Sequence, residues 1–391
     1  MQDLVTPSFI LDEDEFEKNI TNFYNVLNKY FKNSVIGYSF KTNSLPRLLQ
    51  LAKENGCWAE VVSGDEFHLA ERIGFEPNRI IFNGPIKTKE DFYSAISNKS
   101  IVNIDSRQEI VYLKERQTKE IAHIGIRVNF DLEAALPGQT STGKLGGRFG
   151  FCYENGELHK VICELKAISN VKISGLHMHI SNASKSPEVY KMIAEKACTI
   201  AREEGLLLDY IDFGGGYFGG GDNGECYEKY VIAMNSILQN YNMKDIRVIV
   251  EPGASVVATA FSYITSVKDV KQTNYGNFVV SDGSRLHIDP FMVKEQYKYS
   301  IITKSDELVD KQTICGYTCM EKDRIMTLTN KPKLEVGDKI EYSCVGSYTM
   351  CFNSLFISYL PVVYGKRAGE YVIVREKWGI EEFLNKNRWK R

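Results

Sequence analysis

The chain has 391 residues, of which 48 are lysine or arginine and 50 are aspartate or glutamate, so its formal net charge is −2. This length is sufficient for two domains with a sizeable core. The opposite charges are interspersed, which argues against nucleic acid or an anionic membrane surface as a partner. No apolar run approaches the roughly eighteen residues of a membrane span, and the N-terminus lacks the basic-then-apolar signature of a signal peptide. The nine cysteines form no Cys-x-x-Cys pair, which argues against zinc and predicts a reduced, cytoplasmic protein.

Short apolar runs alternate with longer helical patterns from about residue 20 to residue 260, as in a βα repeat. Phe16–Phe31 is amphipathic and predicts a helix at the start of this region. The predicted strands are Val35–Phe40, Cys57–Val62, Arg79–Phe82, Ile101–Ile104, Ile121–Val128, Val171–His177, Tyr210–Phe213 and Arg247–Val250. Eight parallel strands with intervening helices predict a (β/α)8 barrel, an α/β fold of about 250 residues.

After Ala260 the apolar period falls to about two, which is typical of antiparallel strands joined by turns. The strands predicted here are Ser262–Val270, Gly276–Val280, Asp310–Cys315, Arg324–Leu328 and Lys339–Val345, and a helix is predicted only at Ile380–Asn385. The second part of the chain is therefore predicted to be a separate, mostly antiparallel β domain.

Polar groups or glycines stand at the carboxyl end of every predicted barrel strand. They are Lys41, Glu60, Asn83, Asp105, Asn129, His179, Gly214 and Glu251. Barrel enzymes take their catalytic groups from this rim, so the pattern predicts an active site there. Each member taken alone is also compatible with a structural role: Lys41 with a surface or ion-paired lysine, and Glu251 with an ion-paired carboxylate.

The glycine-rich stretch Asp212-Phe213-Gly214-Gly215-Gly216-Tyr217 predicts a loop whose backbone N–H groups can converge on an anion. Gly214–Gly219 also satisfies Gly-x-Gly-x-x-Gly. A dinucleotide site is disfavoured, because that fingerprint opens a first βαβ unit, and this loop follows the seventh predicted strand. A phosphate cradle is the preferred interpretation, and a loop without any ligand is the alternative.

Several stretches together resemble the diaminopimelate/ornithine decarboxylase family. They are Thr6-Pro7-Ser8-Phe9-Ile10, Tyr38-Ser39-Phe40-Lys41-Thr42-Asn43, Val61-Val62-Ser63-Gly64-Asp65-Glu66 and Glu251-Pro252-Gly253. The resemblance implies an enzyme dependent on pyridoxal 5′-phosphate (PLP), with an alanine-racemase-like barrel and Lys41 as the lysine that holds the cofactor. It also implies that the N-terminal segment joins the second domain, which gives a barrel of residues 19–260 and a discontinuous β domain of residues 1–18 and 261–391.

The same resemblance assigns the other cofactor contacts. Glu251 holds the proton of the pyridine nitrogen, and Gly214, Gly215 and Gly216 bind the phosphate. In His177-Met178-His179-Ile180-Ser181-Asn182, His179 stacks on the ring, and Asn182 stands where the family has the serine that binds phosphate. Glu60, Arg148 of Arg148-Phe149-Gly150, and Tyr348 complete the predicted set. A metal pair of His177 and His179 is the alternative, but the sequence offers no third ligand, so no metal is predicted.

Two motifs of the β domain imply a homodimer with shared active sites. Gly316-Tyr317-Thr318-Cys319 resembles the family's Gly-Pro-x-Cys, whose cysteine reaches the partner's site and returns a proton to the carbanion. Val345-Gly346-Ser347-Tyr348 resembles Gly-Ala-Tyr, whose tyrosine touches the cofactor phosphate across the interface. A buried structural thiol is the alternative for Cys319.

Departures from the family concern the substrate. Ala254 and Asp289 stand where the family has arginines, one of which clamps a distal carboxylate, and Met320 stands where a glutamate reads a distal amine. Asp289, Met320 and the following Glu321 are therefore the predicted substrate-binding positions. Replacement cations would come from Arg285, His287 or Arg148. The sequence leaves open which amino acid is used, and whether it is free or tethered to a carrier.

The sequence thus predicts a PLP-dependent decarboxylase of an α-amino acid. Glu251 favours decarboxylation over racemisation, because alanine racemases have an arginine at this place. An amino-acid racemase or epimerase, whose product retains its carboxylate, is the first alternative. A non-catalytic PLP-binding protein is the second, and the β domain with Cys319 and Tyr348 argues against it.

Overall fold

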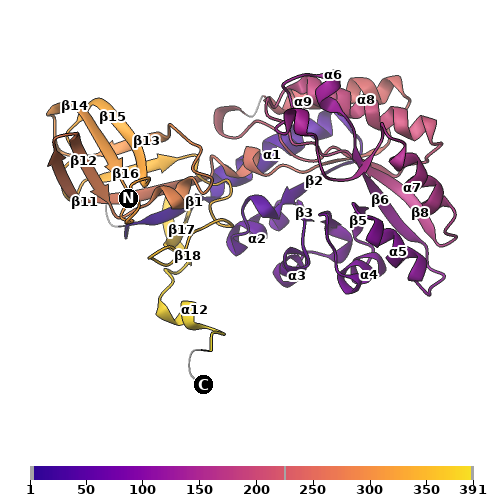
Figure 1. Cartoon of the computed structure of the whole chain (residues 1–391), viewed down its shortest axis with the longest axis horizontal. Coiled ribbons are helices and arrows are strands. Elements are labelled where there is room, and N and C mark those ends of the chain that lie inside the picture. The colour runs from indigo at the N-terminus through magenta and orange to yellow at the C-terminus, as the bar shows by residue number, and fades with distance from the viewer. Residues whose placement is uncertain (1–3, 224–225, 389–391) are drawn as a thin grey trace. The chain divides into compact units, whose positions relative to one another are not determined.

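The computed structural model describes residues 4–223 and 226–388 (Figure 1). The chain divides into two compact units, one of Glu17–Val256 and one drawn from Met1–Phe16 together with Val257–Arg391. Within the described residues, no helix combines the length and the apolarity needed to cross a membrane.

The first unit is a closed barrel of parallel strands, which confirms the predicted fold. Its eight strands in the described residues are β2 (Ser34–Ser39), β3 (Trp58–Val61), β4 (Ile80–Phe82), β5 (Ile101–Ile104), β6 (Ala122–Asn129), β8 (Val171–His177), β9 (Tyr210–Asp212) and β10 (Arg247–Val250). Each strand pairs in parallel with the next, and the β10–β2 pair closes the ring. The short strand β7 (Phe151–Cys152) adds to β6 outside this ring.

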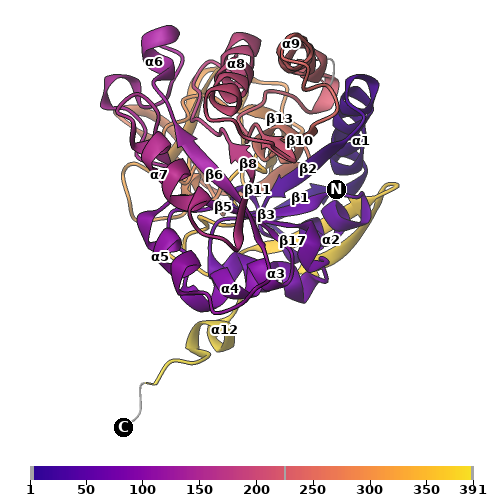
Figure 2. The ribbon, with the colours of Figure 1, turned by 90° about the vertical axis from the view of Figure 1, so that its right-hand side faces the viewer.

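Helices alternate with the strands and surround them in Figure 2. They are α1 (Glu13–Tyr30), α2 (Pro46–Glu54), α3 (Gly64–Ile73), α4 (Lys89–Ser97), α5 (Arg107–Glu115), α7 (Glu157–Lys166), α8 (Pro187–Glu203) and α9 (Cys226–Asn240), with the short α6 (Leu132–Ala135) and α10 (Ala254–Val257). Ser63, Thr88 and Ser186 cap α3, α4 and α8 by accepting backbone hydrogen bonds. These caps start the helices directly after the strand-end loops.

Two glycines in the barrel strands leave room for larger side chains inside the barrel. A Cβ atom at Gly175 would lie 2.2 Å from the ring of Tyr210, and one at Gly125 would lie 2.0 Å from Oδ1 of Asn103. Tyr210 and Asn103 fill this space and are buried. Because no larger residue fits at either position, these glycines set the arrangement of the barrel interior.

The second unit is a mostly antiparallel β structure, as predicted. Its strands are β1 (Ser8–Asp12), β11 (Phe261–Thr273), β12 (Gly276–Ser281), β13 (Lys298–Ile302), β14 (Leu308–Cys315), β15 (Arg324–Pro332), β16 (Lys339–Ser343), β17 (Val362–Arg367) and β18 (Glu370–Arg375), with helices α11 (Arg285–Ile288) and α12 (Ile380–Leu384). Among the described strands of this unit, only the β1–β17 and β12–β14 pairs are parallel. The N-terminal strand β1 lies between β11 and β17 in the sheet.

Candidate active site

Lys41 lies in a 3₁₀ turn, Phe40–Thr42, directly after β2. Its Nζ atom is 2.6 Å from Oε2 of Glu60 on β3, and the same oxygen accepts a hydrogen bond from Ser39. The Lys41 side chain is 40% exposed, whereas that of Glu60 is 1% exposed. Desolvation lowers the pKa of Lys41, but the charges of Glu60 and Glu251 outweigh it and hold the pKa above its usual value. Lys41 is therefore an ammonium group, and its counterion is the buried carboxylate of Glu60, which Ser39 also holds.

Glu251 follows the last barrel strand, β10, and is buried. Its Oε1 atom accepts a hydrogen bond from Nδ2 of Asn83 at 2.6 Å, and its Oε2 atom lies 3.4 Å from Nε2 of His177. Burial raises the pKa of Glu251, but neighbouring His177 and Lys41 more than compensate, and the pKa lies below its usual value. This position thus presents a buried carboxylate anion.

Asp212, the last residue of β9, is a second buried carboxyl group beside Glu251. Burial and the charge of Glu251 raise the pKa of Asp212 well above its usual value, so the pair carries one proton, held by Asp212. The ligand atoms of His177, Asp212 and Glu251 all lie within 4.8 Å of one another. The sequence showed no third ligand for a metal pair of His177 and His179. In the structure, the two groups beside His177 are instead the carboxyl groups of Asp212 and Glu251. This donor set could hold a cation or a protonated ring nitrogen.

The glycine-rich loop after β9 has the geometry of an anion cradle. Gly214 and Gly216 have φ angles of +68° and +97°, which disfavour other residues. A Cβ atom at Gly214 would lie 2.4 Å from Cβ of His179, and one at Gly215 would lie 2.5 Å from the carbonyl oxygen of Glu251. Nδ2 of Asn182, close to Gly216, is buried and has no hydrogen-bond partner among the described residues. An anion bound here would accept a hydrogen bond from this N–H group.

His179 is tied to this loop by its ring. Its Nδ1 atom accepts a hydrogen bond from the backbone N–H of Gly215 at 3.1 Å. Burial, with the nearby charges of Arg127 and Lys41, lowers the pKa of His179 to about 3. The ring is therefore neutral at physiological pH and carries its proton on Nε2. A neutral, fixed ring is suited to stacking on a flat ligand.

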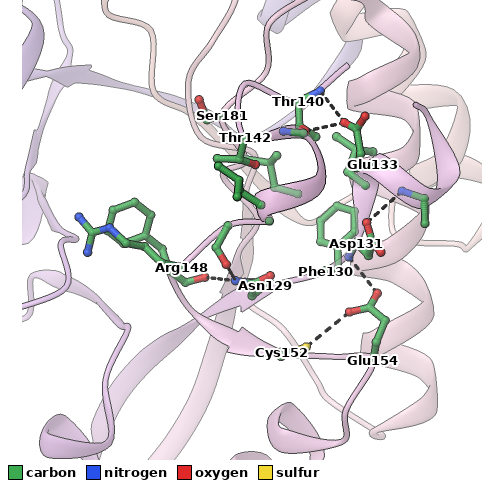
Figure 3. A pocket seen from close by; sticks show the side chains of 18 of the residues that line it. Asn129, Phe130, Asp131, Glu133, Thr140, Thr142, Arg148, Cys152, Glu154 and Ser181 are labelled. Carbon is green, nitrogen blue, oxygen red and sulfur yellow. Dashed lines mark hydrogen bonds between the residues drawn. The ribbon is translucent and has the colours of Figure 1, made fainter. Parts of the chain in front are cut away.

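A pocket of about 940 Å³ adjoins His179 beneath the loop between β6 and β7. Figure 3 shows its three carboxylate side chains, Asp131, Glu133 and Glu154, on the side away from Arg148. Asn129 donates to the carbonyl oxygens of Gly147 and Phe149 and so fixes the loop. The guanidinium group of Arg148 is exposed and stacks on the ring of Phe149 at 4.0 Å. The predicted cofactor residue Arg148 thus lines this pocket.

Arg127, within β6, is a site residue that the sequence analysis did not identify. It is buried, and its Nη1 atom donates to Oδ2 of Asp105 at 2.9 Å. Its guanidinium group lies 4.5 Å from the ring of Phe149 and contributes to the low pKa of His179. The sequence feature that could have identified Arg127 is its charge, which lies between Ile126 and Val128 in an otherwise apolar strand.

Comparison with known proteins identifies the family. The family model of the pyridoxal-dependent decarboxylase, pyridoxal binding domain, matches residues 14–258. This chain belongs to the pyridoxal-dependent decarboxylases. It is 28% identical over 362 residues to a probable chloroplastic diaminopimelate decarboxylase of Oryza sativa subsp. japonica, covering 90% of this chain and 73% of that protein.

Solved structures agree with this family membership. The crystal structure of diaminopimelate decarboxylase from Methanocaldococcus jannaschii superimposes with a TM-score of 0.86 at 23% identity, covering 98% of this chain and 92% of that one. At that identity it demonstrates the shared fold. The Helicobacter pylori diaminopimelate decarboxylase complexed with L-lysine has a TM-score of 0.83 and 25% identity, covering 98% and 97% of the two chains. The resemblance stated from the motifs is confirmed.

The barrel residues fit the cofactor that this decarboxylase family implies, which is PLP. The loop Gly214–Gly216 and the free Nδ2 donor of Asn182 offer a phosphate site in which no additional Cβ atom would fit. The anionic Glu251 suits a protonated pyridine nitrogen. Lys41 would supply the amine that holds the cofactor. All three functions are at the carboxyl ends of strands of the barrel unit.

In the β unit, Cys319 is exposed in the loop between β14 and β15. Asp323 is buried and holds this loop by accepting hydrogen bonds from Ser284 and from the N–H and hydroxyl groups of Thr318. A Cβ atom at Gly316 would lie 2.2 Å from Oδ2 of Asp323, so the glycine of the motif is a steric requirement. The alternative of a buried thiol for Cys319 is wrong.

Tyr348 lies in an aromatic cluster of the β unit. Its ring is 5.7 Å from that of Phe291 and 6.2 Å from that of Phe352, and those two rings are 5.1 Å apart. Tyr348 has a φ angle of +65°, and the preceding Gly346 would place a Cβ atom 2.1 Å from the carbonyl oxygen of Val257. The backbone conformation at Gly346 and Tyr348 is thus restricted, and it determines where the tyrosine side chain starts.

The three predicted substrate positions differ in the structure. Asp289 is buried, and its carboxylate accepts hydrogen bonds from Arg285, from the backbone of Val293 and from that of Lys294. Both carboxylate oxygens thus already have partners within the β unit, and a role of Asp289 in substrate binding stays a prediction. Glu321 has a side chain that is 95% exposed and pairs with Arg324, and Met320 is half-buried in the Cys319 loop. Their substrate role stays a prediction.

Proposed function

We propose that this protein is an enzyme that catalyses the PLP-dependent decarboxylation of an α-amino acid. The observation that carries the proposal is the pairing of Lys41 with Glu60 at one side of the barrel mouth and the buried anion Glu251 at another. Bound PLP supplies a protonated ring that accepts the electrons left when the substrate carboxylate departs. A carboxylate at the ring nitrogen favours this chemistry over the racemase alternative, in which an arginine would hold the nitrogen without its proton.

The chain's own groups divide the work around the bound cofactor. Glu251 holds a proton at the ring nitrogen by a charge-assisted hydrogen bond. Glu60 stabilises the ammonium form of Lys41, which must lose a proton before its amine can attach to a carbonyl group. His179 provides a flat neutral surface, fixed by Gly215.

Relatives support an amino-acid substrate. Those named above are diaminopimelate decarboxylases, and one of them was crystallised with L-lysine. The pocket beside His179 offers room for a side chain of some length, with carboxylates and a guanidinium group on its walls. We infer that the substrate is an α-amino acid with a polar or charged side chain, whether free or tethered to a carrier.

We further propose a homodimer in which Cys319 and Tyr348 complete the active site of the partner subunit. In the β unit, Phe291 and Phe352 are each 54% exposed although they contact each other and Tyr348. Both side-chain polar atoms of the neighbouring Asn353 are buried without a hydrogen-bond partner among the described residues. A second copy of this chain would cover the exposed apolar rings. A cytoplasmic location stays a prediction.

One experiment tests the central proposal. The purified protein is loaded with PLP, reduced with borohydride and mapped by mass spectrometry, and the same preparation is screened for CO2 release from a panel of amino acids. We expect a single label on Lys41 and release of CO2 from at least one substrate. Lys41→Ala should lose both, whereas the control Lys89→Ala, at a surface pair with Glu115, should keep both. Labelling without CO2 release or racemisation would support the non-catalytic alternative.

A further inference from the structure

Asn83 directly follows strand β4, and its side chain is buried between two functional carboxylates. Its Nδ2 atom lies 3.1 Å from Oε1 of Glu60 and 2.6 Å from Oε1 of Glu251. A primary amide has two N–H donors on one nitrogen, so one hydrogen can go to each carboxylate. One small neutral group thus joins the counterion of Lys41 to the carboxylate that faces the ring nitrogen.

The orientation of this amide is determined by its other neighbours. Nδ2 of Asn103 donates to Oδ1 of Asn83 at 2.8 Å, and the hydroxyl group of Tyr210 donates to Oδ1 of Asn103 at 2.7 Å. A flipped Asn83 would point its oxygen at both carboxylates and its donors at another donor. The chain from Tyr210 through Asn103 therefore leaves one arrangement with all partners matched.

The surrounding fold is built to accept this chain of side chains. A Cβ atom at Gly125 would lie 2.0 Å from Oδ1 of Asn103 and 2.2 Å from the hydroxyl oxygen of Tyr210. Tyr210, Asn103 and Asn83 are each at most 4% exposed. A hydrogen-bonded chain that excludes water and depends on a strand glycine indicates a specific role for its last donor.

We propose that Asn83 is a positioning residue that fixes Glu60 and Glu251 together, and thereby sets the distance between the lysine and ring-nitrogen ends of the cofactor site. The inference rests on the proposed function for its consequence, which is tight PLP binding. It predicts that the number of donors at position 83 matters more than the volume of the side chain there. Asn83 provides two donors, serine would provide one, and alanine would provide none.

The test compares Asn83→Ser with Asn83→Ala, which are close in size, and with Asn55→Ala as the matched control. Asn55 undergoes the same chemical change, but its amide donates to the carbonyl oxygen of Leu51 at the end of α2. Loss of a hydrogen bond to a charged group corresponds to about a ten- to hundredfold change in an equilibrium constant. We expect the PLP dissociation constant to rise by about that factor in Asn83→Ala, and by less in Asn83→Ser. Asn55→Ala should stay within about threefold of wild type, because both carboxylates keep their donors.

A second readout does not depend on PLP. In crystal structures of the cofactor-free variants, the carboxylates of Glu60 and Glu251 should leave their wild-type positions in Asn83→Ala, and one of them should stay in Asn83→Ser. If Asn83→Ala does not fold, Asn83→Ser alone decides. Equal PLP affinities in Asn83→Ser and wild type, or unmoved carboxylates in either variant, would overturn the inference. A wild-type protein that binds no PLP would refute the proposed function, and the structures would still decide the role of Asn83.

Discussion

The guanidinium group of Arg285 is bound by the carboxylate of Asp289, which accepts hydrogen bonds from Nε at 3.0 Å and from Nη2 at 2.9 Å. Because Arg285 is paired with Asp289, its charge is not available to a substrate carboxylate. His287 is no substitute, because burial lowers its pKa to about 4 and leaves the ring neutral at pH 7. Of the three replacement cations considered from the sequence, Arg148 is the one that stays exposed beside a pocket.

We therefore predict that meso-diaminopimelate is a poor substrate. A distal carboxylate buried without its partner costs about 2–5 kcal/mol, which corresponds to roughly a thirtyfold to several-thousandfold loss in kcat/KM. Steady-state decarboxylation assays with diaminopimelate, lysine, ornithine and arginine measure this directly. A kcat/KM for diaminopimelate of about 10⁴ M⁻¹s⁻¹ or more contradicts the prediction. If such a value falls sharply in Arg148→Ala, Arg148 is the replacement cation.

Replacing Glu251, the carboxylate proposed to face the ring nitrogen of PLP, should separate cofactor binding from turnover. Glu251→Gln keeps the size of the side chain and one acceptor for Asn83 but removes the charge. We expect PLP to bind and turnover to fall by about ten- to a hundredfold, the value of one charge-assisted hydrogen bond expressed in the transition state. Turnover is measured with PLP at saturation, and circular dichroism checks the fold. Turnover close to wild type excludes the role assigned to Glu251.

Asp212 should make the stability of the cofactor-free protein depend on pH. Its pKa is raised in the folded state, so between the unfolded and folded pKa values the native protein binds one more proton than the unfolded chain. This contribution to the free energy of unfolding is present at low pH and is lost as pH rises, by at most about 1.4 kcal/mol per pH unit. Asp212→Asn removes that slope.

Urea unfolding at pH 5 to 8 measures this effect. The stability of Asp212→Asn relative to wild type should increase with pH, because the variant no longer needs a proton beside Glu251. Asp245→Asn, at an exposed pair with Lys32, is the control and should show no such increase. A difference between wild type and Asp212→Asn that is constant with pH would show that Asp212 is ionised in the native protein.

Shared active sites predict complementation between two inactive variants. Lys41→Ala and Cys319→Ala should each be nearly inactive alone. After mixing and subunit exchange, half of the dimers are mixed and each carries one intact site, so about a quarter of the wild-type activity should return. Exchange is followed by native mass spectrometry. Absence of recovery after complete exchange would place Cys319 outside the partner's site.

The barrel could be predicted because its strands are buried on both faces, so each one is a short apolar run between helical patterns. Strands β13, β17 and β18 could not. Lys298–Ile302 and Glu370–Arg375 are largely exposed, and β17 is interrupted by Gly365, so none gives a clear apolar period. Pairing with neighbouring strands, rather than local sequence, determines these segments.

The candidate site was predictable where one residue with its local motif was sufficient. Lys41, His179, Glu251 and the glycine loop belong to this group. The contacts between residues were not predictable: Asn83 and Glu251 are 168 positions apart and meet only because the barrel closes. Asp289 was assigned to the substrate by its place in a motif, and its ion pair with Arg285, four residues earlier, was not predicted. The position of Asp289 in the sequence identified the loop in which it lies, but it did not predict the partners of its side chain.

The location of β1 in the sheet has a consequence for synthesis on the ribosome. Ser8–Asp12 precedes the barrel in the chain, yet its partners are Phe261–Ile264 of β11 and Val362–Lys366 of β17, which emerge after the whole barrel. The barrel residues lie in one continuous stretch and can fold as they leave the exit tunnel. The strand therefore lacks its full set of partners until β17 has been synthesised. We therefore expect the yield of the folded chain to depend on how well this unpaired strand edge is shielded, by a chaperone for example.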